Sequence, residues 1–144
     1  MKKVFLMLGR ICLSLIFVTA VTNQILTWDA QVPYLTNAVC DWLNQPNLPP
    51  MVTKVLNLLL SYASVAVLVA AILSGLGGVL VLLGIKVRFG VVCLILFLIP
   101  VTVIMHAFWL YQGQTRDLQM IMFLKNISIL GGCFILAASS GGAE

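Results

Sequence analysis

The chain has 144 residues, of which 62% are hydrophobic and only 8% are charged, and its formal net charge is +4. Water-soluble domains carry about 25% charged residues, so this composition excludes a globular protein with a fully hydrated surface. The eight Lys and Arg residues are scattered and form no basic stripe, which excludes nucleic acid as a partner. The apolar runs are long and continuous, which predicts helices that cross a lipid bilayer.

We therefore predict an all-α, polytopic membrane protein, a four-transmembrane-helix bundle that forms one domain over residues 1–144. The spans are expected at about 4–26, 58–83, 89–110 and 118–138, each near the length that crosses a hydrocarbon core. The first span has an alternative interpretation as a cleaved signal peptide, with Lys2 and Lys3 at its start. Arg10 interrupts its apolar region and favours a span that stays in place.

The first outer loop, residues 27–54, is the only sizeable polar segment. Four apolar residues recur in it near helical spacing, namely Val32, Leu35, Val39 and Leu43. This pattern predicts a short amphipathic helix on the membrane surface, ended by the prolines from Pro46 onward. We interpret the segment as a cap on the bundle, with a substrate lid as the alternative.

The positive charges indicate the orientation of the spans. Five of them lie at the inner ends of spans, namely Lys2, Lys3, Arg10, Lys86 and Arg88. Only Lys54 and Arg116 lie on the other side. The excess predicts that both termini of this multi-pass protein are cytoplasmic. The tail at 139–144 is expected to be disordered.

The second span carries small residues at a strict spacing of four: Ala66, Ala70, Ser74 and Gly78. Such a face lets two membrane helices approach closely. The partner helix is either in the same chain or in a second copy, so a homo-oligomer stays open.

Several polar residues fall in the outer half of the spans and form the candidate ligand site: Gln24, Tyr62, His106, Trp109, Lys125 and Asn126. His106 and Lys125 are expected to donate hydrogen bonds to a head group such as that of a quinone, while Trp109 packs on its ring. The alternative is that these residues only hold the helix ends together, with Lys125 reaching the lipid headgroups.

The sequence shows no catalytic constellation, so whether the chain is an enzyme stays open. Its four cysteines form no C-x-x-C pair, and a single His leaves too few ligands for zinc, so no metal site is predicted. Only Cys40 falls outside the spans, which leaves an intermolecular disulfide open.

Short runs in each span resemble the DoxX family. They are Gly9-Arg10 with Phe17-Val18, Gly77-Gly78 with Arg88, His106-Ala107-Phe108-Trp109, and Phe123-Leu124-Lys125-Asn126 followed by Gly131-Gly132. The resemblance implies a four-helix inner-membrane protein, and some relatives are membrane subunits of thiosulfate:quinone oxidoreductases. Members often carry a Gly and a Lys late in the first helix and a Glu before the Gly pair of the second. Val21, Gln24 and Ser74 stand there instead.

Three functions follow as hypotheses. The first is an accessory or anchoring subunit for a membrane-associated redox system, with a membrane or periplasmic protein partner. The second is a quinone-binding oxidoreductase subunit. The third, a small transporter, is disfavoured because the sequence shows neither a clear repeat nor a midplane charge.

Overall fold

A computed structural model describes residues 1–139, and over that range the chain is helical with no strand. The elements are α1 (Lys2–Leu26), α2 (Trp28–Leu43), α3 (Pro50–Ser61), α4 (Ala63–Leu83), α5 (Val87–Met105), the 3-10 turn η1 (Phe108–Leu110) and α6 (Gly113–Ser139). From residue 140 on, the tail that was expected to be disordered lies outside the described residues.

Four helical segments within residues 1–139 are long and apolar enough to cross a membrane: Val4–Leu26, Ala63–Leu83, Val87–Leu110 and Gly113–Ser139. This confirms the prediction of an all-α protein with four spans. Their large apolar side chains are often exposed, as Phe5, Ile72 and Ile135 are. Such exposure is what lipid allows and water does not.

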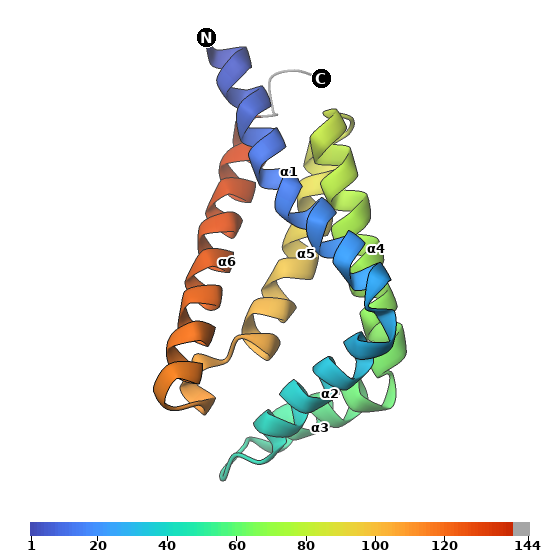
Figure 1. The fold of residues 1–144 in the computed structure, drawn as a ribbon, viewed down its shortest axis with the longest axis vertical. Helices are drawn as coiled ribbons and strands as arrows, with labels where there is room; N and C mark the ends of the chain where they lie inside the picture. The colour runs from blue at the N-terminus through green and yellow to red at the C-terminus, as the bar shows by residue number, and fades with distance from the viewer. Residues whose placement is uncertain (140–144) are drawn as a thin grey trace.

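Figure 1 shows that the two ends of the molecule differ. The start of α1, the end of α6 and the turn between α4 and α5 lie at one end, called here the terminal end. The helices α2 and α3 cross the opposite end, called here the α2–α3 end. Between the two ends, α4 packs against both α1 and α5, and α6 packs against α5.

The segment between the first two spans is more helical than the sequence indicated. The predicted amphipathic helix is present as α2, but a second helix, α3, follows it and begins at Pro50. Proline is tolerated there because the first turn of a helix needs no N–H donor. Tyr62 then leaves helical geometry with φ −117° and ψ 28° and separates α3 from α4, so the second span begins at Ala63.

The end of the third span and the start of the fourth span also differ from the predicted positions. The helix α5 stops at Met105, and η1 follows before α6 begins at Gly113. Gly113 has a φ of +60°, a conformation that glycine adopts without strain. The helix α6 therefore starts five residues before the expected position of 118, and its first turns are polar.

The terminal end holds the apolar core. Its fully or nearly buried members include Phe17, Val81, Val91, Leu94 and Cys133, contributed by α1, α4, α5 and α6. At Gly77 a Cβ atom would lie only 2.8 Å from the carbonyl oxygen of Gly90, so α4 and α5 touch through their backbones. A Cβ atom at Gly78 would lie 3.1 Å from the Cβ of Phe17 in α1, so α4 also packs closely on that side. At Gly78 the small-residue face of α4 therefore packs against α1 of the same chain.

Candidate functional site

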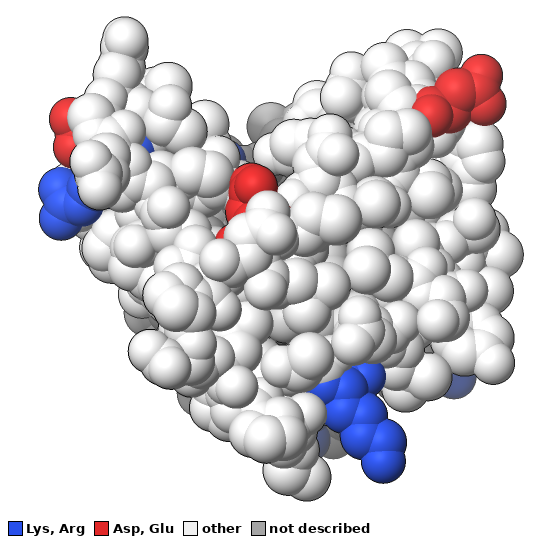
Figure 2. Space-filling model, turned by 90° about the horizontal axis from the view of Figure 1, so that it is seen from below, with Lys and Arg blue, Asp and Glu red and all other residues white. Residues whose placement is uncertain are grey.

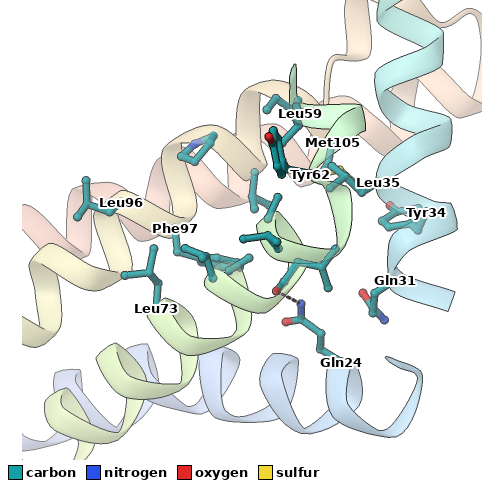
Figure 3. A pocket seen from close by; sticks show the side chains of 18 of the residues that line it. Gln24, Gln31, Tyr34, Leu35, Leu59, Tyr62, Leu73, Leu96, Phe97 and Met105 are labelled. Carbon is teal, nitrogen blue, oxygen red and sulfur yellow. Dashed lines mark hydrogen bonds between the residues drawn. The ribbon is translucent and has the colours of Figure 1, made fainter. Parts of the chain in front are cut away.

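A pocket of about 770 Å³ opens near the α2–α3 end and is bounded by residues of α1, α2, α3, α4 and α5. Its walls are mainly aliphatic and aromatic, with Leu73, Leu96 and Phe97 among the side chains drawn in Figure 3. Ligand pockets in proteins commonly measure about 300–1,000 Å³ and are apolar with a few placed polar groups. The pocket fits that description.

Small residues leave the room that the pocket occupies. Ala66 and Ala70 belong to the same face of α4 as Gly78, and both line the pocket. Pro100 lines it from α5. The break at Tyr62 lets α3 depart from the direction of α4, so that both α3 and α4 contribute to the wall.

The polar groups of the pocket come from two helices, α1 and α2, and from two residues that flank helices: Asn23, Gln24, Gln31, Tyr34, Tyr62 and His106. Gln24 Nε2 donates to the Val67 carbonyl oxygen at 3.3 Å, which ties α1 to α4. Figure 3 shows Gln24, Gln31 and Tyr34 on the same side of the pocket. No Lys, Arg, Asp or Glu is among the lining residues within the described chain.

His106 lies where α5 ends, and its ring is held by the last span. Its Nδ1 is 2.8 Å from Oε1 of Gln119 in α6. Either tautomer of the ring can make this contact, because the Gln119 amide can present its oxygen or its nitrogen to Nδ1. The contact fixes the orientation of a side chain that lines the pocket.

Two hydrogen bonds attach α2 to the end of α5 and the segment after it. Trp42 Nε1 donates to the Ile104 carbonyl oxygen at 3.2 Å, and the Tyr111 hydroxyl donates to Asp41 Oδ2 at 2.7 Å. Burial, followed by the hydrogen bond and the negative charge of Asp41, raises the pKa of Tyr111 to about 12. The hydroxyl therefore keeps its proton and remains a donor at physiological pH.

The pocket brings together three of the six predicted site residues: Gln24, Tyr62 and His106. Trp109 instead forms edge-to-face contacts with Trp42, Phe108 and Phe123, with ring centroids 5.1–5.8 Å apart.

The other two predicted residues lie on α6. Lys125 is exposed, with its Nζ 3.3 Å from Met122 Sδ, and Asn126 is 5% exposed. None of the described residues of α6 lines the pocket, because α6 packs on α5 rather than on α1 or α4 at this end.

Sequence reasoning missed three residues of the site. Two of them, Gln31 and Tyr34, lie three residues apart in α2. They line the pocket together with the neighbouring Leu35. The helical periodicity that predicted α2 contained this signal, because residues three and four apart share a face. Gln119 carried no such signal, since its role depends on the approach of α6 to the end of α5.

The described residues contain no grouped metal ligands and no disulfide within the chain. Among residues 1–139 no three His, Cys, Asp or Glu side chains are grouped to hold a metal ion. The four cysteines are unpaired in this described part of the chain, with Cys12 and Cys40 exposed and Cys93 and Cys133 buried.

Comparisons with known proteins cover most of the chain. A family model described as DoxX matches residues 5–107. The inner membrane protein YphA of Escherichia coli strain K12 is 28% identical over 142 residues, which cover 99% of this chain and 87% of that protein. No solved structure matches the chain.

Proposed function

The chain belongs to the DoxX family and is an integral membrane protein, and from that premise we propose that it is an accessory subunit of a membrane redox system that binds a quinone. One observation carries the proposal: the pocket joins an apolar wall to a polar rim within a single cavity of about 770 Å³. A quinone has the matching form, with a polar ring and a long apolar chain.

The charge distribution favours a neutral ligand. The pocket residues include no acidic or basic side chain other than His106 in the described chain. Figure 2 looks onto the α2–α3 end, where acidic and basic side chains are few and separated by uncharged surface. An ionic ligand placed there would lose hydration without gaining a partner.

Extraction of the purified protein tests the proposal. The protein is purified in nanodiscs made from its native membrane, and quinone per protein is measured by mass spectrometry against empty nanodiscs. We expect enrichment in the wild type and loss of it in Ala70→Leu, whose larger side chain fills the pocket. Gly131→Leu is the matched control, because a Cβ at Gly131 meets no atom within 4 Å. Wild-type protein with no more quinone than empty nanodiscs would refute the proposal.

A purely anchoring subunit is the second candidate. It is supported by the exposed apolar side chains of α3, among them Met51, Val55 and Leu58. A protein partner resting on α3 would cover them. Mild-detergent purification at native expression tests this function, which requires a stoichiometric partner that is lost in Met51→Glu. Recovery of the chain alone would count against it.

We also propose that both termini face the cytoplasm of a bacterial inner membrane, which places the α2–α3 end on the periplasmic side. The excess of Lys and Arg at the terminal end supports this orientation. The description of the Escherichia coli relative as an inner membrane protein supports the choice of membrane. Cys40 on α2 is exposed, so a membrane-impermeant maleimide should label intact cells and fail to label Cys40→Ser. Labelling that requires permeabilised cells would reverse the orientation.

A further inference from the structure

Arg10 belongs to the face of α1 that packs against α4. It precedes Phe17 by seven residues and Val21 by eleven, so the three side chains share one side of the helix. Each of them lies beside a glycine of α4, and the glycine beside Arg10 is Gly84, where α4 ends. A cation therefore stands in line with the apolar residues that join the two helices.

The guanidinium of Arg10 rests on the turn between α4 and α5. Gly84 caps α4 in the left-handed conformation, with a φ of +75°. A Cβ atom at Gly84 would lie 2.9 Å from Arg10 Cζ and 3.1 Å from Nη2, so the guanidinium fills the space that a side chain there would need. The charged group therefore lies on the protein instead of extending away from it into water.

Arg10 has no partner for its charge among residues 1–139. Its Nε is buried without a hydrogen bond, and no residue in this range forms an ion pair with it. The acidic residues of the range, Asp29, Asp41 and Asp117, belong to α2 and the first turns of α6, toward the α2–α3 end (Figure 1). A cation that has lost part of its hydration favours a site where an anion approaches it.

Two further cations lie on the same turn. Lys86 and Arg88 are both exposed, and neither forms an ion pair within the part of the chain that the structure describes. Large apolar side chains alternate with them, because Ile85 and Phe89 are each 54% exposed. Positive charge and exposed apolar surface therefore occur together at the terminal end, as they do where a protein meets lipid headgroups.

We propose that Arg10, Lys86 and Arg88 bind the phosphate of an anionic phospholipid. A guanidinium presents parallel N–H donors that match two phosphate oxygens. The two exposed cations favour a lipid with a net negative charge over a zwitterionic one. Ile85 and Phe89 then lie against its acyl chains, which a free phosphate ion lacks. This site is at the opposite end from the pocket, so it does not depend on the ligand proposed there.

Lipid binding by the full chain tests the proposal. The protein is delipidated in a neutral detergent, and native mass spectrometry measures its affinity for phosphatidylglycerol and for phosphatidylcholine with the same acyl chains. We expect the wild type to bind phosphatidylglycerol about tenfold more tightly. Arg10→Gln should weaken phosphatidylglycerol binding about tenfold, because it removes the charge-assisted hydrogen bonds to the phosphate.

Two further variants control for net charge and for folding. Arg116→Gln also removes one arginine, but Arg116 lies in the first turns of α6, away from the terminal end, so phosphatidylglycerol affinity should not change. Arg88→Gln should weaken binding about fivefold. Because Arg88 is exposed, its replacement leaves the helix contacts intact and decides the question if Arg10→Gln fails to fold.

Three results would overturn the inference. The first is equal affinity of the wild type for the two lipids. The second is an equal loss of phosphatidylglycerol affinity in Arg88→Gln and Arg116→Gln, which would mean that binding follows net charge alone. The third is displacement of phosphatidylglycerol by excess inorganic phosphate, which would assign the site to a soluble phosphate. Retention of the lipid in excess phosphate supports the lipid as the ligand.

Discussion

The two ends of the molecule are built from the same helices in opposite ways. At the terminal end, glycines let α4 pack closely against both neighbours: Gly77 meets the backbone of α5 at Gly90, and Gly78 meets the Phe17 side chain of α1. At the α2–α3 end, Ala66 and Ala70 on the same helix leave a pocket unfilled. Small residues of one helix thus lie in a close helix–helix interface at one end of the molecule and along a pocket wall at the other.

The two ends also differ in the hydrogen bonds that connect their helices. The core of the terminal end is apolar and has almost no side-chain hydrogen bonds between helices in the described residues, whereas hydrogen bonds of Gln24, Trp42, Tyr111 and His106 connect different elements at the other end. Apolar packing in lipid depends on close fit, so it tolerates little change. Polar attachment of a surface helix to a span depends on a few specific bonds.

The largest effect is expected from Gly77→Val, which would break the packed end. Its Cβ would lie 2.8 Å from both the Gly90 carbonyl oxygen and the Leu94 side chain, so α4 and α5 must separate. Overpacking of this kind costs about 3 kcal/mol. Thermal unfolding followed by size-exclusion chromatography should show a large loss of folded protein.

Gly131→Val is the control for that experiment. A Cβ at Gly131 meets no atom within 4 Å, and a side chain raises helix propensity over glycine. Equal destabilisation by the two variants would mean that the α4–α5 contact is not the tighter one.

A smaller effect is expected from Tyr111→Phe, which removes the bond to Asp41 that attaches α2. Loss of a hydrogen bond to a carboxylate at this half-buried site costs about 1.5 kcal/mol. Hydrogen exchange should become faster in the C-terminal turns of α2 and stay unchanged in α4 and α5. Tyr34 lies on α2 itself, and its hydroxyl makes no hydrogen bond within the described residues, so Tyr34→Phe should leave the exchange rates of α2 unchanged.

The same attachment should be lost at alkaline pH. Burial and Asp41 raise the pKa of Tyr111 to about 12, above its ordinary value of 10.0. A raised pKa stabilises the folded form fully below the unfolded value, so the contribution is present below about pH 10 and disappears as the pH approaches 12. Tryptophan fluorescence from the Trp42–Trp109 contact should report this change, and Tyr111→Phe should lack it.

The smallest effect is expected from Ser14→Ala. Ser14 is 0% exposed and its hydroxyl has no hydrogen-bond partner in the described chain. Removing an unsatisfied polar group should therefore stabilise the protein by about 1 kcal/mol.

Ser74→Ala should act in the opposite direction, because Ser74 is equally buried but donates to the Ala71 carbonyl oxygen at 3.2 Å. Thermal unfolding of both variants checks the sign. Destabilisation by Ser14→Ala would show that its hydroxyl has a partner.

The sequence by itself determined that the chain lies in a lipid bilayer, that its fold is all-α, and which family it resembles. Composition and long apolar runs required four spans in lipid, and helical spacing between Val32 and Leu43 located α2. These properties are local, because the length of a span and the period of a helix depend on neighbouring residues only.

Only the tertiary structure decided which polar residues share a site. From the sequence, Lys125 and His106 lie at the same depth. In the structure Lys125 is exposed on α6, whereas His106 lines the same pocket as Gln24 and Gln31. Depth follows from position along a helix, but the direction of a side chain follows from rotation and from which helix packs beside it. That rotation depends on contacts far apart in the chain, such as those of Gly77 with Gly90 and of His106 with Gln119.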